Sequence, residues 1–442
     1  MPSYSININK SYNIPKSLPI VRFDDKILVI DVLRANWIVL DSEKQLDIFK
    51  SFQKGISIES MLKSHPHSES DINYVVTQIE ARQLYNQTVQ NQIADKTLHF
   101  YLTNGCNLLC PHCYMFSGTP TKDELKTTEI KKVLSDFSKI AGGKIVTFSG
   151  GEPTLRKDFD DIVEYAYDLG LEIKLMTNGT TLNPDRISAL ARFISSVQVS
   201  IDGFSEKSNA EIRGAGNFQK SLETVDAFIA NNVYTSIAIT PKYDVLRDNH
   251  TGYLFFAREL ESRYEGKAFE LRFSEELLRG RCISDVSDIN KEYGKSVSNI
   301  LHEIYGDDYE VMEFVKMLMD NPIIENCSYG EITVAANGDV FLCPRISDLK
   351  PIGNIRMNPF DELLKRAMAA EHLSNVENLH PCNECELRYI CGGGCRIEEF
   401  SALINDMCSD HNSKSRKCDQ WVKKKYYDMM IRSNEYFYKD LE

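Results

Sequence analysis

Residues 99–116 read HFYLTNGCNLLCPHCYMF, an apolar run that leads directly into three closely spaced cysteines. HFYLTN (99–104) has the aromatic and β-branched composition of a short strand, and Cys106, Cys110 and Cys113 follow it in a C-x3-C-x2-C pattern. With 12 cysteines in 442 residues, this spacing arises rarely by chance. Three thiolates on one loop suit an iron–sulfur cluster, and a zinc site completed by a distant fourth ligand is the alternative.

Downstream of this loop the chain alternates apolar strands with amphipathic helices, which predicts a parallel sheet. Six such units are too few for a closed eight-stranded barrel, so we expect an α/β fold in the form of an open, partial (β/α)6 barrel. Functional residues of such barrels lie at the carboxyl ends of the strands. The predicted strands are 99–104, 144–150, 172–179, 196–203, 234–240 and 269–277, and the helices that follow them are 127–141, 159–170, 184–194, 218–232, 252–264 and 289–306.

The ends of these predicted strands carry motifs that resemble the radical S-adenosylmethionine (SAM) superfamily. SGGEP (149–153) follows the second strand, TNG (177–179) the third and SIDG (200–203) the fourth, and Arg213 stands shortly after. The resemblance implies that Cys106, Cys110 and Cys113 hold a [4Fe–4S] cluster whose fourth iron is open to SAM. It implies SAM contacts from the backbone near His112 and from Gly150, Gly151, Glu152, Asn178, Ser200 and Arg213.

The roles of these contacts follow from the same resemblance. The glycines allow a close backbone approach to the SAM amine, while Ser200 and Arg213 hold its carboxylate, which suits the forked geometry of a guanidinium. Asp202 either fixes the turn or touches the cofactor. The implied chemistry is reductive cleavage of SAM to a 5′-deoxyadenosyl radical, which abstracts hydrogen from a substrate carbon.

Eight further cysteines lie beyond residue 326, in a region of short strands and few helices. Their spacing resembles the SPASM extension of peptide-modifying radical SAM enzymes, which holds two auxiliary [4Fe–4S] clusters, and a zinc ribbon is the alternative. The resemblance assigns Cys327, Cys343 and Cys395 to auxiliary cluster I, which then has an open iron, and Cys382, Cys385, Cys391 and Cys418 to auxiliary cluster II, with Cys408 as the alternative to Cys418.

One cysteine stands apart from these sets. Cys282 lies in RGRCISD (279–285), just after the sixth predicted strand, where related enzymes carry a Gly-Arg pair near the cofactor. We treat Cys282 as a candidate catalytic residue that donates a hydrogen atom, with ligation of auxiliary cluster I and a buried structural role as alternatives.

The first 88 residues resemble the peptide-recognition module of enzymes that mature ribosomal peptides. Short strands at 20–23, 26–31 and 37–40 precede helices at 42–53, 57–65 and 69–85, which is a winged-helix-like layout; Ser42 and Ser57 are expected N-caps, and Gly55 an expected stop. In that family a leader peptide adds as a strand to the small sheet, and we expect IVRF and KILVID to offer the edge. We therefore divide the chain into a leader-recognition domain (1–88), a radical SAM barrel (97–310) and a SPASM domain (315–442), with residues 86–96 as a linker.

Composition restricts the remaining functions. The formal net charge is −13, and residues 1–90 hold 10 basic and 10 acidic side chains, which disfavours nucleic acid and anionic membranes as partners. No apolar stretch of membrane-spanning length and no signal peptide is present, so we expect a cytoplasmic protein with reduced thiols.

The resulting prediction is a radical SAM maturase that binds a ribosomal precursor peptide by its leader and forms a thioether or carbon–carbon cross-link. Its expected cofactors are SAM and three [4Fe–4S] clusters, and its electron donor is a flavodoxin or ferredoxin. A peptide epimerase and a sulfatase-maturing, formylglycine-generating enzyme are alternatives within the class. An iron–sulfur regulator whose N-terminal module binds DNA is the alternative from another class.

Overall fold

The computed structural model describes residues 8–86, 95–283, 287–320, 323–327, 329–397, 418, 420–434 and 436. The chain divides into two compact units, each built from segments that are distant in the sequence. Met1–Gln92, Asp308–Cys327 and His372–Glu442 form one unit, here called the terminal unit; Ile93–Asp307 and Ser328–Glu371 form the other, called the barrel unit. None of the helices in the described ranges has the length and apolar character that a membrane crossing requires.

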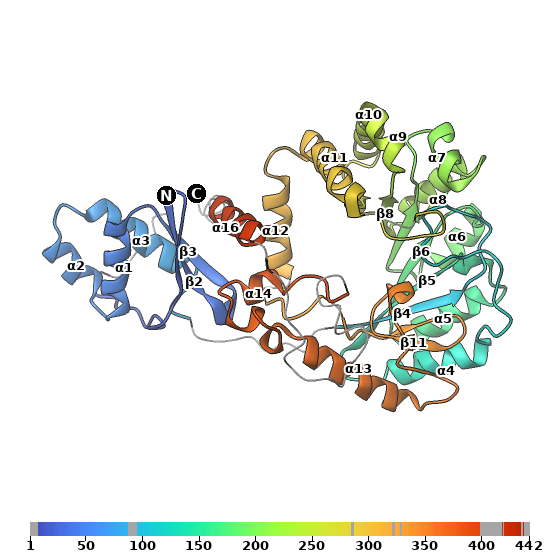
Figure 1. Ribbon diagram of the computed structural model, residues 1–442, viewed down its shortest axis with the longest axis horizontal. Helices are drawn as coiled ribbons and strands as arrows, with labels where there is room; N and C mark the ends of the chain where they lie inside the picture. The colour runs from blue at the N-terminus through green and yellow to red at the C-terminus, as the bar shows by residue number, and fades with distance from the viewer. Residues whose placement is uncertain are drawn as a thin grey trace. The chain divides into compact units, whose positions relative to one another are not determined.

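The barrel unit contains the six parallel strands that the alternation predicts. They pair in sequence order, and helices α4, α5, α6 and α8 lie on the outer side of the strands (Figure 1). Apolar side chains at alternate positions of these strands are buried, among them Leu98, Phe100, Leu102, Ile237 and Ile239. The strands are β4 (Lys96–Thr103), β5 (Gly143–Gly150), β6 (Glu172–Thr177), β7 (Ser196–Ser200), β8 (Tyr234–Ile239) and β9 (Phe269–Phe273).

The six predicted helices of the barrel unit are present; all six end earlier than predicted, and α10 and α11 begin two residues earlier. The sequence did not predict α7 and α9. Asn183 begins α6 by accepting a hydrogen bond from the backbone N–H of Arg186, and Pro184 occupies the first helical position, where it is well tolerated. The helices are α4 (Thr127–Phe137), α5 (Phe159–Asp168), α6 (Pro184–Leu190), α7 (Glu206–Arg213), α8 (Phe218–Ala230), α9 (Tyr243–Asp248), α10 (His250–Arg263) and α11 (Ser287–Tyr305).

Three short strands from beyond residue 330 extend the barrel sheet, which the sequence did not predict. β10 (Thr333–Val334) pairs in parallel with β4, and β11 (Asp339–Phe341) and β12 (Gly353–Asn354) continue the sheet in antiparallel order. The compact units therefore do not follow the three predicted sequence ranges, because residues 328–371 join the barrel through these strands. α13 (Phe360–Ser374) follows them.

The N-terminal part of the terminal unit has the predicted winged-helix-like layout. β1 (Ile20–Phe23), β2 (Lys26–Asp31) and β3 (Asn36–Leu40) form an antiparallel sheet, followed by α1 (Glu43–Gln53), α2 (Ile58–Ser64) and α3 (Glu69–Ala81). The hydroxyls of Ser42 and Ser57 cap α1 and α2 as expected, and Gly55 has a positive φ just past α1. β2 is the central strand, so the expectation that KILVID offers a sheet edge is wrong; the edges are β1 and β3.

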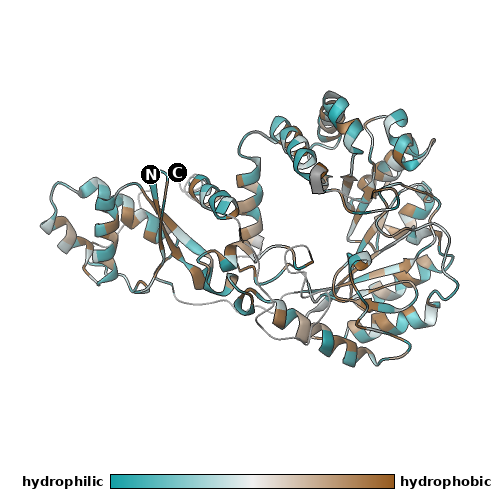
Figure 2. Ribbon diagram, viewed as in Figure 1, coloured by the Kyte–Doolittle hydropathy of each residue, from teal (hydrophilic) through white to brown (hydrophobic). Residues whose placement is uncertain are grey.

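Both faces of β2 and β3 are buried, whereas β1 is partly exposed. Ile27, Val29, Ile38 and Leu40 pack with the apolar faces of α1, α2 and α3. The opposite face, which includes Trp37 and Val39, packs against side chains of the C-terminal part of the terminal unit. Burial on both faces explains why the strands read as continuous apolar runs rather than as alternating ones, and these strands are brown along much of their length in Figure 2.

The second face is covered by helices from the other end of the chain. Trp37 donates its indole N–H to the carbonyl of Met430, 3.0 Å away, and its ring lies 5.9 Å from that of Phe314. These partners come from α16 (Gln420–Ser433) and α12 (Tyr309–Asp320), and α14 (Arg388–Cys391) adds Tyr389 and Ile390 to the same core. The predicted linker 86–96 lies largely outside the described residues.

Candidate functional site

The three-cysteine loop leaves the end of β4 and is closed by backbone hydrogen bonds. The N–H of Cys106 donates to the carbonyl of Gly118 at 2.8 Å, and the N–H of Gly118 donates to that of Asn104 at 2.9 Å. All three thiols are free and half-buried, and burial raises the pKa of Cys106 and Cys110. A metal that binds here has to displace the thiol protons, as is general for cysteine ligands.

The two glycines at the end of β5 are required by the three-cysteine loop (residues 104–118), called the cluster loop below. A Cβ on Gly150, whose φ is +126°, would lie 2.4 Å from the carbonyl oxygen of Thr103, and one on Gly151 would lie 2.2 Å from that of Gly105. The N–H of Gly151 donates to Thr103 at 2.8 Å. The glycines therefore allow the loop backbone to approach closely. The predicted approach to the SAM amine stays a prediction.

Glu152 is turned into the protein and links the ends of three strands. Its side chain is fully buried, and its carboxylate accepts hydrogen bonds from the hydroxyl of Thr177 and the N–H of Asn178, both at 2.8 Å. Its own N–H donates to the carbonyl of Gly105 at 2.8 Å. Burial raises the pKa of Glu152 above its ordinary value, and these donors offset only part of that rise. Its side chain holds the TNG turn in this structure, and a SAM contact from Glu152 stays a prediction.

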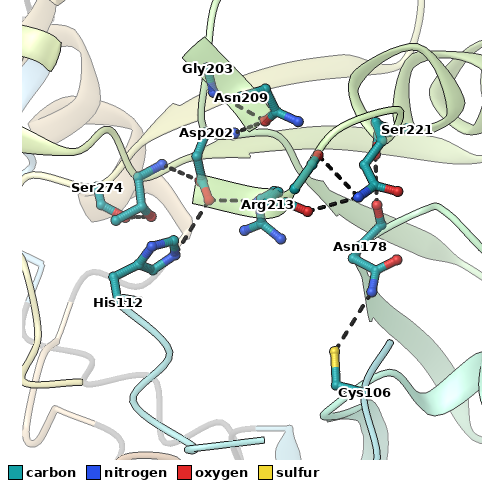
Figure 3. A network of polar contacts seen from close by, with 12 residues as sticks. Cys106, His112, Asn178, Asp202, Gly203, Asn209, Arg213, Ser221 and Ser274 are labelled. Carbon is teal, nitrogen blue, oxygen red and sulfur yellow. Dashed lines mark hydrogen bonds and ion pairs between the residues drawn. The ribbon is translucent and has the colours of Figure 1, made fainter. Parts of the chain in front are cut away.

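Asn178 connects that turn to the cluster loop. Its side-chain amide donates to the carbonyl oxygen of the Asn107 side chain at 3.0 Å and lies 3.9 Å from the Cys106 sulfur (Figure 3). The side chain of Asn178 is buried. The predicted site residues at the ends of β4, β5 and β6 are thus joined in one network.

Asp202, after the end of β7, is the centre of a second network. Its side chain is fully buried, one carboxylate oxygen accepts from Arg213 Nε at 2.6 Å and lies 3.3 Å from His112 Nε2, and the other accepts from the N–H of Thr240 at 2.8 Å. Figure 3 shows His112 and Arg213 approaching Asp202 from two sides. Asp202 therefore orients one residue of the cluster loop and the arginine expected to hold the SAM carboxylate.

The pairing of Arg213 leaves part of its guanidinium available. In the described part of the chain, Arg213 donates to a carboxylate only through Nε. Its two terminal nitrogens can therefore bind a second carboxylate. Ser200, at the end of β7, is half-buried. The imidazole of His112 contacts Asp202, and burial lowers the pKa of that ring although the carboxylate raises it.

The segment Arg279–Ile283 packs against the backbone of the cluster loop. The N–H of Cys282 donates to the carbonyl of Pro111 at 2.8 Å, and the N–H of Arg281 donates to that of Cys113 at 3.3 Å. The guanidinium of Arg281 reaches the carbonyls of Cys110 and Ser117. The thiol of Cys282 is exposed rather than buried, which removes the small buried side chain as an interpretation.

Four of the C-terminal cysteines line a single cavity in the terminal unit. The cavity has a volume of about 190 Å³ and is bordered by α14, by the first turns of α16 and by the segment before them. Burial raises the pKa of the Cys385 thiol to about 11. The cysteines are Cys382, Cys385, Cys391 and Cys418, the set predicted for auxiliary cluster II; Cys408 lies outside the described residues.

The cysteines predicted for auxiliary cluster I are divided between the two units. In the terminal unit, the N–H of Arg396, which follows Cys395, donates to the sulfur of Cys327 at 3.4 Å. Cys343 lies in the barrel unit, where Tyr101 donates to the adjacent Pro344 carbonyl at 2.6 Å. No three possible metal ligands in the described residues lie close enough to form a ready-made metal site, and these ligand sets stay predictions.

Sequence reasoning missed the central position of Asp202 and the clamp formed by Arg281. SIDG left the role of Asp202 open, because only the fold brings His112 and Arg213 to the same carboxylate. The Gly280–Arg281 pair, which follows the end of β9 by seven residues, was the available signal.

Two family models match the chain. The model described as the radical SAM superfamily covers residues 100–244, and the SPASM model, described as an iron-sulfur cluster-binding domain, covers residues 326–386. Mycofactocin maturase MftC of Mycobacterium ulcerans (strain Agy99) is 27% identical over 323 residues, which span 69% of this chain and 83% of that protein. AdoMet-dependent heme synthase of Methanosarcina barkeri (strain Fusaro / DSM 804) is 28% identical over 340 residues, spanning 70% and 93%.

Solved structures with a similar fold include two that contain AdoMet. The structure of anSMEcpe with bound AdoMet and Cp18Cys peptide has a TM-score of 0.54 at 19% identity and covers 77% of this chain and 99% of that one. Streptococcus suis SuiB bound to S-adenosylmethionine has a TM-score of 0.50 at 15% identity and covers 91% and 98%. At these identities the likeness concerns the fold.

Proposed function

Because the chain is a radical SAM enzyme with a SPASM iron–sulfur domain, we propose that it matures a ribosomally made precursor peptide by forming a thioether or carbon–carbon cross-link. Its cofactors are SAM and [4Fe–4S] clusters. The observation that carries the proposal is the Asp202–Arg213 pair beside the three-cysteine loop, at the carboxyl ends of parallel strands.

The residues of the barrel fit the cofactors that this proposal requires. We propose Cys106, Cys110 and Cys113 as ligands of the SAM cluster, and Arg213 with Ser200 as the holder of the SAM carboxylate. Asp202 keeps the guanidinium of Arg213 in one orientation, and the buried Glu152 keeps the TNG turn against the loop. When bound, the cofactors supply an organic radical, and the chain's own residues supply position and exclusion of water.

The proposed substrate class rests on the N-terminal module and on one relative. MftC carries the name of a maturase, whereas the heme synthase of similar identity does not act on a peptide by its name. The match with SuiB covers 91% of this chain. The unmatched part is shorter than the 88-residue N-terminal module, so the match includes at least part of that module. A module with a small antiparallel sheet supports leader binding by strand addition.

The two edge strands of the small sheet, β1 and β3, differ in whether side chains already bind their backbone groups. At β3, the side chain of Gln78 accepts from the N–H of Val39 at 3.2 Å, and Arg82 donates to the carbonyl of Trp37 at 3.0 Å. Both side chains belong to or follow α3, so a peptide that adds to β3 has to displace them. At β1, no neighbouring strand occupies the outer edge in the described ranges, which makes β1 the edge we propose for the leader.

Anaerobic incubation tests the proposal. The chain is combined with SAM, dithionite and a precursor peptide encoded by a neighbouring reading frame, and the products are examined by mass spectrometry. We expect 5′-deoxyadenosine together with a peptide lighter by two hydrogen atoms. Turnover of SAM with no change in any candidate peptide, and with conversion of a porphyrin instead, would reject the peptide substrate.

Peptide epimerisation is the second candidate, because one observation favours it. The exposed thiol of Cys282 stands next to the cluster loop, through the 2.8 Å bond between its N–H and the Pro111 carbonyl. A thiol there can return a hydrogen atom to a Cα radical. For this function we expect Cys282→Ala to abolish deuterium uptake by the peptide from solvent while 5′-deoxyadenosine still forms; an unchanged uptake would remove Cys282 from the proposal.

Cys418 is the proposed fourth ligand of auxiliary cluster II, and iron content distinguishes it from Cys408. We expect about 12 irons per chain for three [4Fe–4S] clusters, and a loss of up to about four in Cys418→Ala, because the thiol lines the four-cysteine cavity. Cys408→Ala is the matched control and keeps its iron. Loss of iron in the Cys408 variant alone would exchange the two assignments.

The remaining partners follow from the chemistry. We propose that a flavodoxin or ferredoxin supplies the electron and that the reaction takes place in the reducing cytoplasm. In support, no cysteine within the described ranges forms a disulfide.

A further inference from the structure

The cavity that contains four cysteines is also bordered by two cationic side chains. Arg388, at the start of α14, and Lys423, in the first turn of α16, both line it. The acidic Glu384 lines the same cavity, and Lys423 is paired with Glu386, so the two cations stand beside carboxylates as well as beside four cysteines.

Arg388 has a buried N–H that no group of the described residues accepts. Its Nε is buried without a hydrogen-bond partner, whereas its Nη1 donates to the carbonyl of Asn383 at 2.6 Å. Buried donors are nearly always paired, and an unpaired charged donor is especially unfavourable. Arg388 and four cysteines line the same cavity, and the sulfurs of an iron–sulfur cluster accept such hydrogen bonds.

Lys423 is fixed on the same cavity by a carboxylate. Its Nζ donates to both carboxylate oxygens of Glu386, at 2.9 and 3.0 Å, and Glu386 is the direct neighbour of Cys385. Tyr427 also donates to Glu386. The side chain of Lys423 is 29% exposed, and both the solvent and the carboxylate of Glu386 compensate part of its charge. Removing Lys423 leaves the Glu386 carboxylate beside Cys385 without this cation. The N–H of Leu387 adds a further donor, 3.4 Å from the Cys385 sulfur.

We propose that Arg388 and Lys423 are positioning residues that raise the reduction potential of auxiliary cluster II. This rests on the proposed assignment of that cluster to the four-cysteine cavity. A [4Fe–4S] core held by four thiolates becomes more negative by one charge when it takes up one electron. A nearby cation and an N–H···S hydrogen bond stabilise the more negative state, so they make the cluster a better electron acceptor. Such an acceptor suits the electron that remains when a cross-link closes on the peptide.

The test is an EPR-monitored redox titration of the full-length, reconstituted chain with dithionite as reductant. Cys106, Cys110 and Cys113 are replaced by alanine in every sample, so the SAM cluster makes no signal. We expect Lys423→Met and Arg388→Met each to shift the potential of one auxiliary signal to more negative values, and Arg388→Lys to shift it less. Lys424→Met is the matched control, because Lys424 is exposed on the same helix, does not line the cavity, and should leave both potentials unchanged.

Several results would overturn the proposal. They are an unchanged potential in Lys423→Met, a shift toward positive values, or an equal shift in the Lys424 control. If Arg388→Met loses its cluster, Lys423→Met and Arg388→Lys still decide the question. The potential is measured without peptide, so the result does not depend on whether the chain matures a peptide. A missing second auxiliary signal would reject the assignment of auxiliary cluster II to this cavity.

Discussion

Asp202→Ala is expected to reduce 5′-deoxyadenosine formation by roughly 100-fold or more. The substitution leaves the side chain of Arg213, which is 11% exposed, as a buried cation without its partner. Breaking a buried pair in this way destabilises the folded state by about 3–5 kcal/mol. A 100-fold lower rate corresponds to a loss of about 2.7 kcal/mol of transition-state stabilisation, which is the part of the effect that turnover measures. His112 loses its contact at the same time, so both His112 of the cluster loop and Arg213, the residue proposed to hold the SAM carboxylate, lose their orientation.

The measurement combines anaerobic turnover, SAM affinity and thermal unfolding. Asp202→Asn keeps an acceptor for the N–H of Thr240 but removes the charge, and we expect an intermediate loss. Asp248→Ala removes a carboxylate from an exposed pair with Arg247, and we expect wild-type turnover from it. Wild-type SAM affinity in Asp202→Ala would mean that Arg213 binds no carboxylate of the cofactor.

Gly280→Val is expected to eliminate the SAM cluster. A Cβ at this position would lie 2.5 Å from the carbonyl oxygen and 2.6 Å from the carbonyl carbon of His112, distances that real Cβ atoms do not adopt. The segment cannot move away freely, because the N–H groups of Arg281 and Cys282 bind the same loop. The loop itself must therefore shift, and its thiols with it.

Iron analysis and EPR with added SAM measure this effect. We expect about four irons fewer per chain and no SAM-dependent change in the cluster signal. Arg279→Ala alters the exposed neighbouring residue and should keep both. A Gly280→Val chain with full iron content and a normal response to SAM would contradict the role of this segment as a clamp.

The six barrel strands and the small N-terminal sheet could be predicted because each strand is a compact apolar run between turn residues. The motifs at the strand ends could be placed for the same reason, since parallel strands present their carboxyl ends at one edge. The pairing of β10 with β4 could not, because two residues at Thr333–Val334 carry no periodicity and join a strand over 200 positions earlier.

The orientation of individual site residues also lay beyond the sequence. The carboxylate of Glu152 points into the TNG turn, and the ring of His112 contacts Asp202, because packing decides where each side chain finds its hydrogen bonds. The central position of β2 depends on the order of pairing, which an all-apolar strand does not reveal. Charge and burial in the cavity of Arg388 became visible only after α14 and α16 were brought together.

The hydrogen bond between the Trp37 indole and the Met430 carbonyl joins residues separated by 393 positions, and it has a consequence for synthesis on the ribosome. The first strands emerge early, yet one apolar face of their sheet finds its partners only when the last helix has left the exit tunnel. Until then the nascent chain carries an uncovered Trp37 face, and such surfaces are bound by chaperones or aggregate. Chains that stop before residue 420 should therefore be cleared as unfinished, so that the N-terminal module matures only on a chain that also contains Cys418.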